Sequence, residues 1–270
     1  MVYSGEGIHP TAVIAAGAIL GDGCAVGPYS VIGPSVVLGA RNRIGSHVVI
    51  EGNTTIGDDN VVYQFASIGA EPQDLKFKGE KSTLKIGNKN IIREYVTLQP
   101  GTAGGGMRTL IGDGNLFMAN THVGHDSIIG DGNVFANSAA ISGHVIVGNR
   151  VTIGGLSGIH QFVRIGDLAI LGGGSMVTKD IPPFTMAQGD RAELIGLNLV
   201  GLERKGFSED QISILKSLFR NTLRAKGLLK DKVSQSREQT KNFEAGNFFL
   251  DFIASSERGV ALPRRTKGDA

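Results

Sequence analysis

Residues 123–164 read VGHDSI-IGDGNV-FANSAA-ISGHVI-VGNRVT-IGGLSG-IHQFVR, and each six-residue unit begins with Val, Ile or Phe. The same spacing runs unbroken from Ile8 to Ile68, returns from Ile86 to Leu98, and returns again from Ile111 to Val177. An apolar residue at every sixth position is typical of a parallel β-helix, in which each unit forms one side of a coil. Three units make one turn of a triangular coil. Residues 18 positions apart are therefore expected to stack at the ~4.8 Å spacing of paired strands.

Two interruptions break the repeat and predict loops. Between Ile68 and Ile86 the expected apolar positions fall on Asp74 and Glu80, so we expect residues 73–85 to leave the solenoid. A second loop, residues 99–110, contains a run of three glycines and shifts the repeat by one residue. The units that begin at Ile68 and Leu98 fall on the same side of the triangle. Both loops are therefore expected to emerge at one edge of the solenoid.

The repeat is expected to end at Pro182-Pro183, because two prolines remove the donors that further strand pairing needs. Beyond Arg191 the sixfold pattern is lost, and Ser208 with Gln211 has the form of a capping box at the start of a helix. The sequence thus predicts a β-helical domain at 1–183 and a small α-helical domain at 184–270.

Composition narrows the class of protein. The single cysteine, Cys24, cannot form an internal disulfide, which favours the reducing cytoplasm. No stretch approaches the ~20 apolar residues that a membrane span needs, and no targeting signal precedes Ile8. Positive charge is in excess after residue 184, but no basic run is interleaved with aromatic residues. A nucleic-acid partner is therefore not expected.

Histidines gather on the side that carries the loops. His125, His144 and His160 belong to units of that side, and His122 ends the preceding unit, whereas the other two of the six histidines lie elsewhere. The 18-residue period stacks His125, Gly143 and Gln161 in consecutive coils, and likewise Asp126 and His144. Several histidines converging beneath two loops predict a functional site at this edge.

The residue types at this edge favour acyl transfer. No Ser, Cys or Lys stands out as an activated nucleophile, so we expect a direct transfer that needs a general base. Asp126 would hold one ring nitrogen of His125, leaving the other free to accept a proton. Gly143 could present its N–H to a developing oxyanion. Because a packed solenoid has no cleft along its edge, a second subunit would complete the pocket, most simply in a cyclic trimer.

Several motifs match one enzyme family in order along nearly the whole chain. They are Gln73-Asp74-Leu75-Lys76, Val123-Gly124-His125-Asp126, Gly143-His144, Ile159-His160-Gln161-Phe162 and Leu202-Glu203-Arg204-Lys205-Gly206-Phe207. Together with the repeat they resemble the UDP-N-acetylglucosamine 3-O-acyltransferases, which begin lipid A synthesis. The resemblance implies a left-handed parallel β-helix followed by helices, and a homotrimer with sites between subunits. It implies transfer of an (R)-3-hydroxyacyl group from acyl carrier protein to the 3-hydroxyl of UDP-N-acetylglucosamine, with no metal or other cofactor.

The resemblance also assigns roles to residues. It makes His125 the general base, Asp126 its support and Gly143 the oxyanion donor. It places ten residues in substrate binding: Asp74, Lys76 and His122 hold the sugar, His144 and Gln161 lie around the acyl donor and the nucleotide sugar, Asn198 and Arg204 bind the nucleotide, and Gln73, His160 and Lys205 complete the set. It makes Gly173, stacked on Gly155, a gauge of acyl-chain length that admits long chains. Lys205 stands where the family often has arginine, and Val200 where it has an acidic residue.

Three alternatives remain open from the residues alone. One is the N-acyltransferase that acts later in the same pathway, which has an additional N-terminal domain, whereas this repeat begins at Ile8. A second is a metal-dependent hydratase of the carbonic anhydrase type, in which histidines of neighbouring subunits bind zinc. The third is a scaffold without catalytic activity, in which the histidines are incidental.

Overall fold

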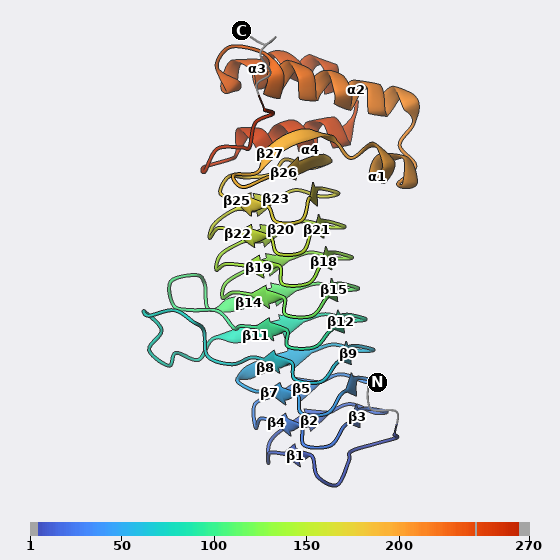
Figure 1. Ribbon diagram of the computed structural model, residues 1–270, viewed down its shortest axis with the longest axis vertical. Coiled ribbons are helices and arrows are strands. Elements are labelled where there is room, and N and C mark those ends of the chain that lie inside the picture. Colours follow the sequence, from blue (N-terminus) through green and yellow to red (C-terminus); the bar gives the residue numbers. More distant parts are fainter. Residues whose placement is uncertain (1–4, 241, 265–270) are drawn as a thin grey trace.

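Three parallel sheets form the sides of a triangular solenoid in the computed structural model, which describes residues 5–240 and 242–264 (Figure 1). Sheet I contains β1 (Val13–Ile14), β4 (Val31–Ile32), β7 (Val49–Ile50), β10 (Ser67–Ile68), β13 (Thr97–Leu98), β16 (His122–Val123), β19 (Ala140–Ile141), β22 (Gly158–Ile159) and β25 (Met176–Val177). Sheet II contains β2 (Ile19–Leu20), β5 (Val37–Leu38), β8 (Asn53–Ile56), β11 (Thr83–Ile86), β14 (Arg108–Ile111), β17 (Ile128–Ile129), β20 (Ile146–Val147) and β23 (Arg164–Ile165). Sheet III contains β3 (Ala25–Val26), β6 (Arg43–Ile44), β9 (Val61–Val62), β12 (Ile91–Ile92), β15 (Leu116–Phe117), β18 (Val134–Phe135), β21 (Thr152–Ile153), β24 (Ile170–Leu171), β26 (Thr185–Gln188) and β27 (Glu193–Leu197).

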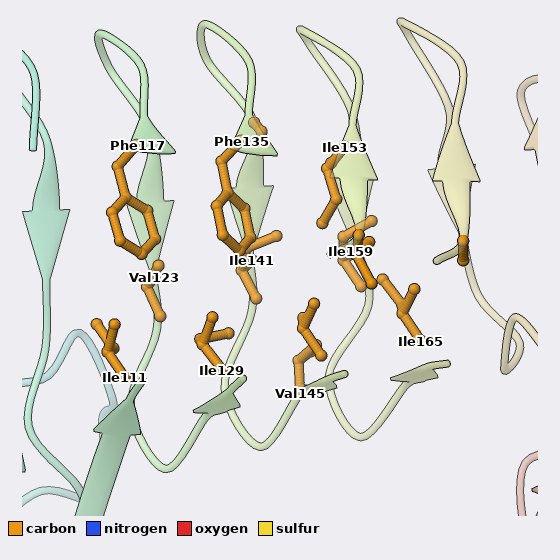
Figure 2. Close-up of a cluster of buried hydrophobic side chains, with 14 of the residues drawn as sticks. Ile111, Phe117, Val123, Ile129, Phe135, Ile141, Val145, Ile153, Ile159 and Ile165 are labelled. Atoms are coloured by element: carbon orange, nitrogen blue, oxygen red, sulfur yellow. The ribbon is translucent and has the colours of Figure 1, made fainter. Parts of the chain in front are cut away.

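The register confirms the predicted 18-residue period. Val123 pairs with Ile141, and Ile141 pairs with Ile159. The second residue of each pair of strand residues points inward, so the apolar residues of the repeat form one continuous core. Figure 2 shows these columns, in which the rings of Phe117 and Phe135 stack with centroids 4.7 Å apart. Like residues at like positions thus pack from coil to coil, which gives the solenoid its rigidity.

Each corner of the triangle is a column of turns, and we name it by the sheets that it joins. Both loops emerge at the I–II edge, as expected, and project from one side of the solenoid (Figure 1). They are shorter than the sequence suggested, because residues 83–85 and 108–110 belong to the strands β11 and β14. β8, β11 and β14 have four residues each and pair along their whole length. The C-terminal ends of both expected loops therefore belong to sheet II.

The expectation that Pro182-Pro183 ends strand pairing is wrong. β26 lies beyond the prolines and pairs in parallel with β24, and β27 then adds an antiparallel strand. The prolines lie between the Ile165–Ile181 bridge and β26. At this turn the missing N–H groups interrupt no ladder, so the sheet continues past them.

Helices cover the C-terminal end of the solenoid (Figure 1). They are α1 (Leu199–Arg204), α2 (Glu209–Phe219), a π-helical turn (Arg220–Arg224), α3 (Leu229–Ser236), a 3-10 turn (Arg237–Thr240) and α4 (Glu244–Ala254). The predicted capping box is confirmed, since Ser208 and Gln211 exchange side-chain to backbone hydrogen bonds at the start of α2. Among the described residues, no helix is both long and apolar enough to cross a membrane.

A ladder of buried asparagines stabilises the II–III edge. The Asn90 Nδ2 donates to Asn60 Oδ1 and to the Gly112 carbonyl, and the Asn90 Oδ1 accepts from the backbone N–H and the side chain of Asn115. All three asparagines are essentially inaccessible to solvent. Each amide therefore satisfies polar groups of the coils above and below it.

Asn90→Ala is expected to lower the free energy of unfolding by about 2 kcal/mol or more, because several buried groups lose their partner at once. Denaturation followed by circular dichroism measures the loss. Asn149→Ala is the matched control: Asn149 also bonds to neighbouring coils, but it is exposed, so water replaces those bonds. Equal losses in the two variants would contradict this role of the buried ladder.

Candidate active site at the I–II edge

The turns of the I–II edge bring the predicted histidines together. His125 and Asp126 follow β16, His144 follows β19, and His160 follows β22. Asp126 and His144 occupy the same turn position in adjacent coils, with φ angles of 58° and 61°. The His144 Nε2 lies 4.0 Å from the Asp126 Oδ2, so the predicted stacking of these two residues is confirmed.

Asp126 is the buried anchor of the cluster. Its side chain is 0% exposed, and its Oδ2 lies 2.8 Å from the His125 Nδ1. Its two carboxylate oxygens also accept hydrogen bonds from the Thr102 backbone N–H, at 2.9 Å, and from the Thr102 hydroxyl, at 2.6 Å. An ionised carboxylate only accepts, so the His125 Nδ1 donates to it and the neutral ring keeps Nε2 as a free acceptor.

Gly143 lies directly against the His125 ring. A β-carbon added at Gly143 would lie 2.6 Å from both Cε1 and Nε2 of that ring, closer than real side chains approach. Gly143 is buried, and within the described part of the chain its N–H has no hydrogen-bond acceptor. This free N–H adjoins the ring that carries the free acceptor nitrogen.

Two further histidines of this side, His122 and His144, lie in surroundings that favour their neutral form. Burial lowers the pKa of His122, whose Nδ1 lies 2.7 Å from the Thr97 hydroxyl. Burial also lowers the pKa of His144, although the negative charges of Asp126 and then Asp74 oppose that shift. The His144 ring stacks on Phe162 with centroids 4.4 Å apart. Both rings are thus fixed in place as neutral hydrogen-bonding groups.

The two loops flank the cluster and contact each other. In the first loop Gln73 and Lys76 are exposed, and Asp74 accepts a hydrogen bond from the Lys76 N–H. The Glu80 carboxylate of the same loop accepts a hydrogen bond from the Ala103 N–H in the second loop, at 2.9 Å. The loops therefore form one wall beside the histidines.

Five of the predicted site residues lie on other edges of this chain. Asn198 caps α1 and donates to the Leu168 carbonyl, which places it with Arg204 and Lys205 near the II–III edge. Gly155 and Gly173 stack as predicted, but in turns of the III–I edge, where the Gly174 N–H donates to the Gly155 carbonyl. Figure 1 shows α1 on the side of the molecule away from the loops. A single chain thus separates the predicted site into three parts.

Sequence reasoning missed the residues that support Asp126. Thr102 lies in a loop, and Thr109 is a strand residue whose hydroxyl accepts a hydrogen bond from the Asp126 N–H. Gly105 packs so closely on the Asp126 carboxylate that a β-carbon there would overlap it. The glycine run of the second loop was the available signal, because glycines mark places where a backbone must approach another group closely.

His125, Asp126 and His144 are also near enough to be considered as metal ligands. One potential ligand atom from each lies within 4.8 Å of the others. Both oxygens of Asp126 already accept hydrogen bonds from Thr102, and Oδ2 also faces the His125 Nδ1. The donor set therefore suits a supported base better than an open metal site.

Comparisons with known proteins agree with the geometry. Residues 180–261 match the family profile described as UDP-N-acetylglucosamine O-acyltransferase, domain 2, and residues 108–143 match the bacterial transferase hexapeptide repeat. An acyl-(acyl-carrier-protein)–UDP-N-acetylglucosamine O-acyltransferase of Myxococcus xanthus (strain DK1622) is 51% identical over 94% of this chain and 98% of its own. The chain belongs to this family. A relative of the same name from Rickettsia bellii (strain OSU 85-389) is 55% identical over 93% of this chain and 89% of its own.

Solved structures of the O-acyltransferase family share the fold. The UDP-N-acetylglucosamine O-acyltransferase of Moraxella catarrhalis RH4 superposes with a TM-score of 0.92 at 42% identity, over 94% of this chain and 99% of that one. The Arabidopsis enzyme superposes with a TM-score of 0.81 at 33% identity, over 95% of this chain and 100% of its own. The protein is thus an acyltransferase with a left-handed parallel β-helix and C-terminal helices. Family membership sets aside the N-acyltransferase, the hydratase and the scaffold.

Proposed function

We propose that the chain transfers an (R)-3-hydroxyacyl group from acyl carrier protein to the 3-hydroxyl of UDP-N-acetylglucosamine, in the cytoplasm, as the first step of lipid A synthesis. The M. xanthus and R. bellii relatives carry these substrates in their names. The observation that carries the mechanism is the His125 ring, with its Nδ1 on buried Asp126 and its Nε2 beside Gly143. No cofactor enters this mechanism.

The reaction needs one base and one oxyanion donor. The His125 Nε2 takes the proton of the sugar 3-hydroxyl as the oxygen attacks the thioester carbon. The unpartnered Gly143 N–H stabilises the negative charge on the former carbonyl oxygen. The C–S bond then breaks, the ester forms, and the protonated His125 returns its proton to the thiolate of the carrier. Asp126 stabilises the imidazolium and stays ionised throughout.

The roles of the other predicted residues follow from their places. Gln73, Asp74, Lys76, His122, His144, His160 and Gln161 line the I–II edge or its loops and bind the sugar and the acyl donor. Asn198, Arg204 and Lys205 bind the nucleotide from another copy of the chain. Arg204 and Lys205 are exposed, so both cations are available to phosphate.

A homotrimer reunites the three parts of the site. Sheet III lies between the edge that carries Gly173 and the edge near Asn198, so a copy whose sheet III faces the I–II edge supplies both. Five outward residues of sheet III are apolar and not buried in one chain, namely Val61, Ile91, Leu116, Val134 and Ile170, whereas β6 and β21 carry Arg43 and Thr152 at this position. Burying such a face stabilises association. Light scattering in dilute buffer tests this proposal, and a fully active monomer would contradict it.

The activity itself is tested by incubating the purified protein with a 3-hydroxyacyl-acyl carrier protein and UDP-N-acetylglucosamine. We expect a 3-O-acylated sugar nucleotide and free carrier thiol in equal amounts. Transfer to the 3-amino analogue of the sugar is run in parallel, because it shows whether the hydroxyl or the amino sugar is the preferred acceptor. No acyl transfer to UDP-N-acetylglucosamine, or transfer to the amino analogue alone, would contradict the proposed function.

Gly173→Met is expected to shift the donor preference from long to shorter acyl chains with activity retained. A β-carbon at Gly173 meets only the Gly155 backbone, at 3.4 Å, so a side chain is accommodated by the coil and extends outward. It would fill space that a long acyl tail otherwise occupies. Competition between carriers charged with different chain lengths measures the change. An unaltered length profile would mean that the tail runs elsewhere.

A further inference from the structure

The segment that follows α4 returns to the histidine edge and contributes an arginine to it. We propose that Arg258 is a positioning residue that fixes the proton of His160 on Nε2, so that His160 offers a hydrogen-bond donor to the substrate. This rests on the proposed function, in which His160 binds substrate. Neither the repeat nor the family motifs pointed to Arg258.

The returning segment is firmly attached to the solenoid. The Asp180 N–H donates to the Gly259 carbonyl at 3.0 Å, and the Ala261 N–H donates to the Asp180 carbonyl at 2.8 Å. The buried Asp180 carboxylate also accepts a hydrogen bond from the Ser256 hydroxyl at 2.8 Å. Arg258 lies between these bonds, so its backbone cannot drift away from the edge.

The Arg258 guanidinium is itself held against the last coil. Its Nε and Nη2 donate to the Thr178 carbonyl at 3.2 and 3.1 Å. The same Nη2 lies 3.2 Å from the His160 Nδ1. A guanidinium nitrogen carries only donors, and Nη2 has a second hydrogen to give. The His160 Nδ1 must therefore accept, and the proton of the neutral ring must lie on Nε2.

A second neighbour favours the opposite arrangement. The Gln161 carbonyl oxygen lies 3.1 Å from the same Nδ1, and it could accept a hydrogen bond only from a protonated Nδ1. The two neighbours thus compete for one ring nitrogen. Arg258 prevails in the neutral ring, because its hydrogen bond is charge-assisted and because a proton on Nδ1 would point at the Nη2 hydrogen. Without Arg258, the Gln161 carbonyl favours a proton on Nδ1, and the Nε2 of the neutral His160 ring then becomes an acceptor.

Ring nitrogen-15 chemical shifts of the histidine-labelled full-length protein test the assignment directly. Spectra are recorded near pH 8, where an unperturbed histidine is neutral, and His160→Gln assigns the signal. We expect the Nε2–H form in the wild type and the Nδ1–H form in Arg258→Leu. Arg264→Leu is the matched control, because Arg264 lies in the same segment, 85% exposed, and leaves the His160 contact intact. A wild-type ring in the Nδ1–H form, or an Nε2–H form that persists in Arg258→Leu, would overturn the proposal.

Kinetics separate this inference from the proposed function on which it rests. Losing one hydrogen bond to substrate raises KM by about 2- to 10-fold, and Arg258→Leu should do so with little change in kcat. The effect should vanish in a His160→Gln background, since Arg258 acts through that ring. If the tautomer changes as expected but KM does not, His160 does not bind substrate, and the assignment in the proposed function fails instead.

Discussion

His125→Ala is expected to lower kcat by a factor of roughly 10²–10⁴, the usual contribution of a general base. The ring lies in a turn outside the apolar core, so its removal leaves no core cavity, and the thermal transition should stay close to that of the wild type. Steady-state kinetics with acyl carrier protein thioester and UDP-N-acetylglucosamine measure the loss.

His47→Ala is the matched control for His125→Ala. His47 is also a turn histidine, but it stacks between Tyr29 and Phe65 on the III–I edge. Its removal should leave kcat unchanged. Wild-type turnover by His125→Ala, or an equal loss in both variants, would remove the proposed mechanism.

Gly143→Ala is expected to reduce kcat by about 100-fold, because displacing a catalytic group by about 1 Å can cost that much. The new methyl group would lie 2.6 Å from the His125 Nε2, and Asp126 prevents the ring from simply turning away. The same change would also disturb the N–H proposed to stabilise the oxyanion.

Gly130→Ala separates this local effect from a general cost of crowding a coil. A β-carbon at Gly130 would lie 2.6 Å from the Asn149 Oδ1 and 2.7 Å from the Gly148 carbonyl oxygen, but on the II–III edge, away from His125. Both variants should lose stability to a similar extent, and only Gly143→Ala should lose turnover. Normal kcat in Gly143→Ala would show that the ring and the N–H have room to adjust.

The fold could be predicted from the sequence because each six-residue unit forms one side of a coil and 18 residues form one turn. In a β-helix each sixth residue turns inward, so the apolar columns that begin at Ile8 and Ile111 follow from the sequence alone. The same period placed Gly143 on His125 and Asp126 beside His144. The start of α2 could also be predicted, because Ser208 and Gln211 have the sequence pattern of a capping box.

Segments without a period could not be placed by this reasoning. Thr102 reaches Asp126 from a loop, and Arg258 reaches His160 after the chain has passed through all of the helices. Sheet III continues past Pro183 because the pairing of β24 with β26 does not use the N–H groups that the prolines lack. The sequence alone does not show which N–H groups the pairing uses. The period could not place Asn198 either, because Asn198 caps α1, where the sixfold repeat has ended.

The most direct test of a site shared between chains is complementation between two inactive variants. His125→Ala lacks the base, and the double variant Arg204→Ala, Lys205→Ala lacks the nucleotide-binding cations of the neighbouring edge. Co-expressed in equal amounts with different tags, they should form mixed trimers, and in each mixed trimer one of the three sites, about a third, is intact. The account predicts that mixed trimers recover about that fraction of wild-type activity, while each variant alone stays inactive. No recovery in isolated mixed trimers would contradict it.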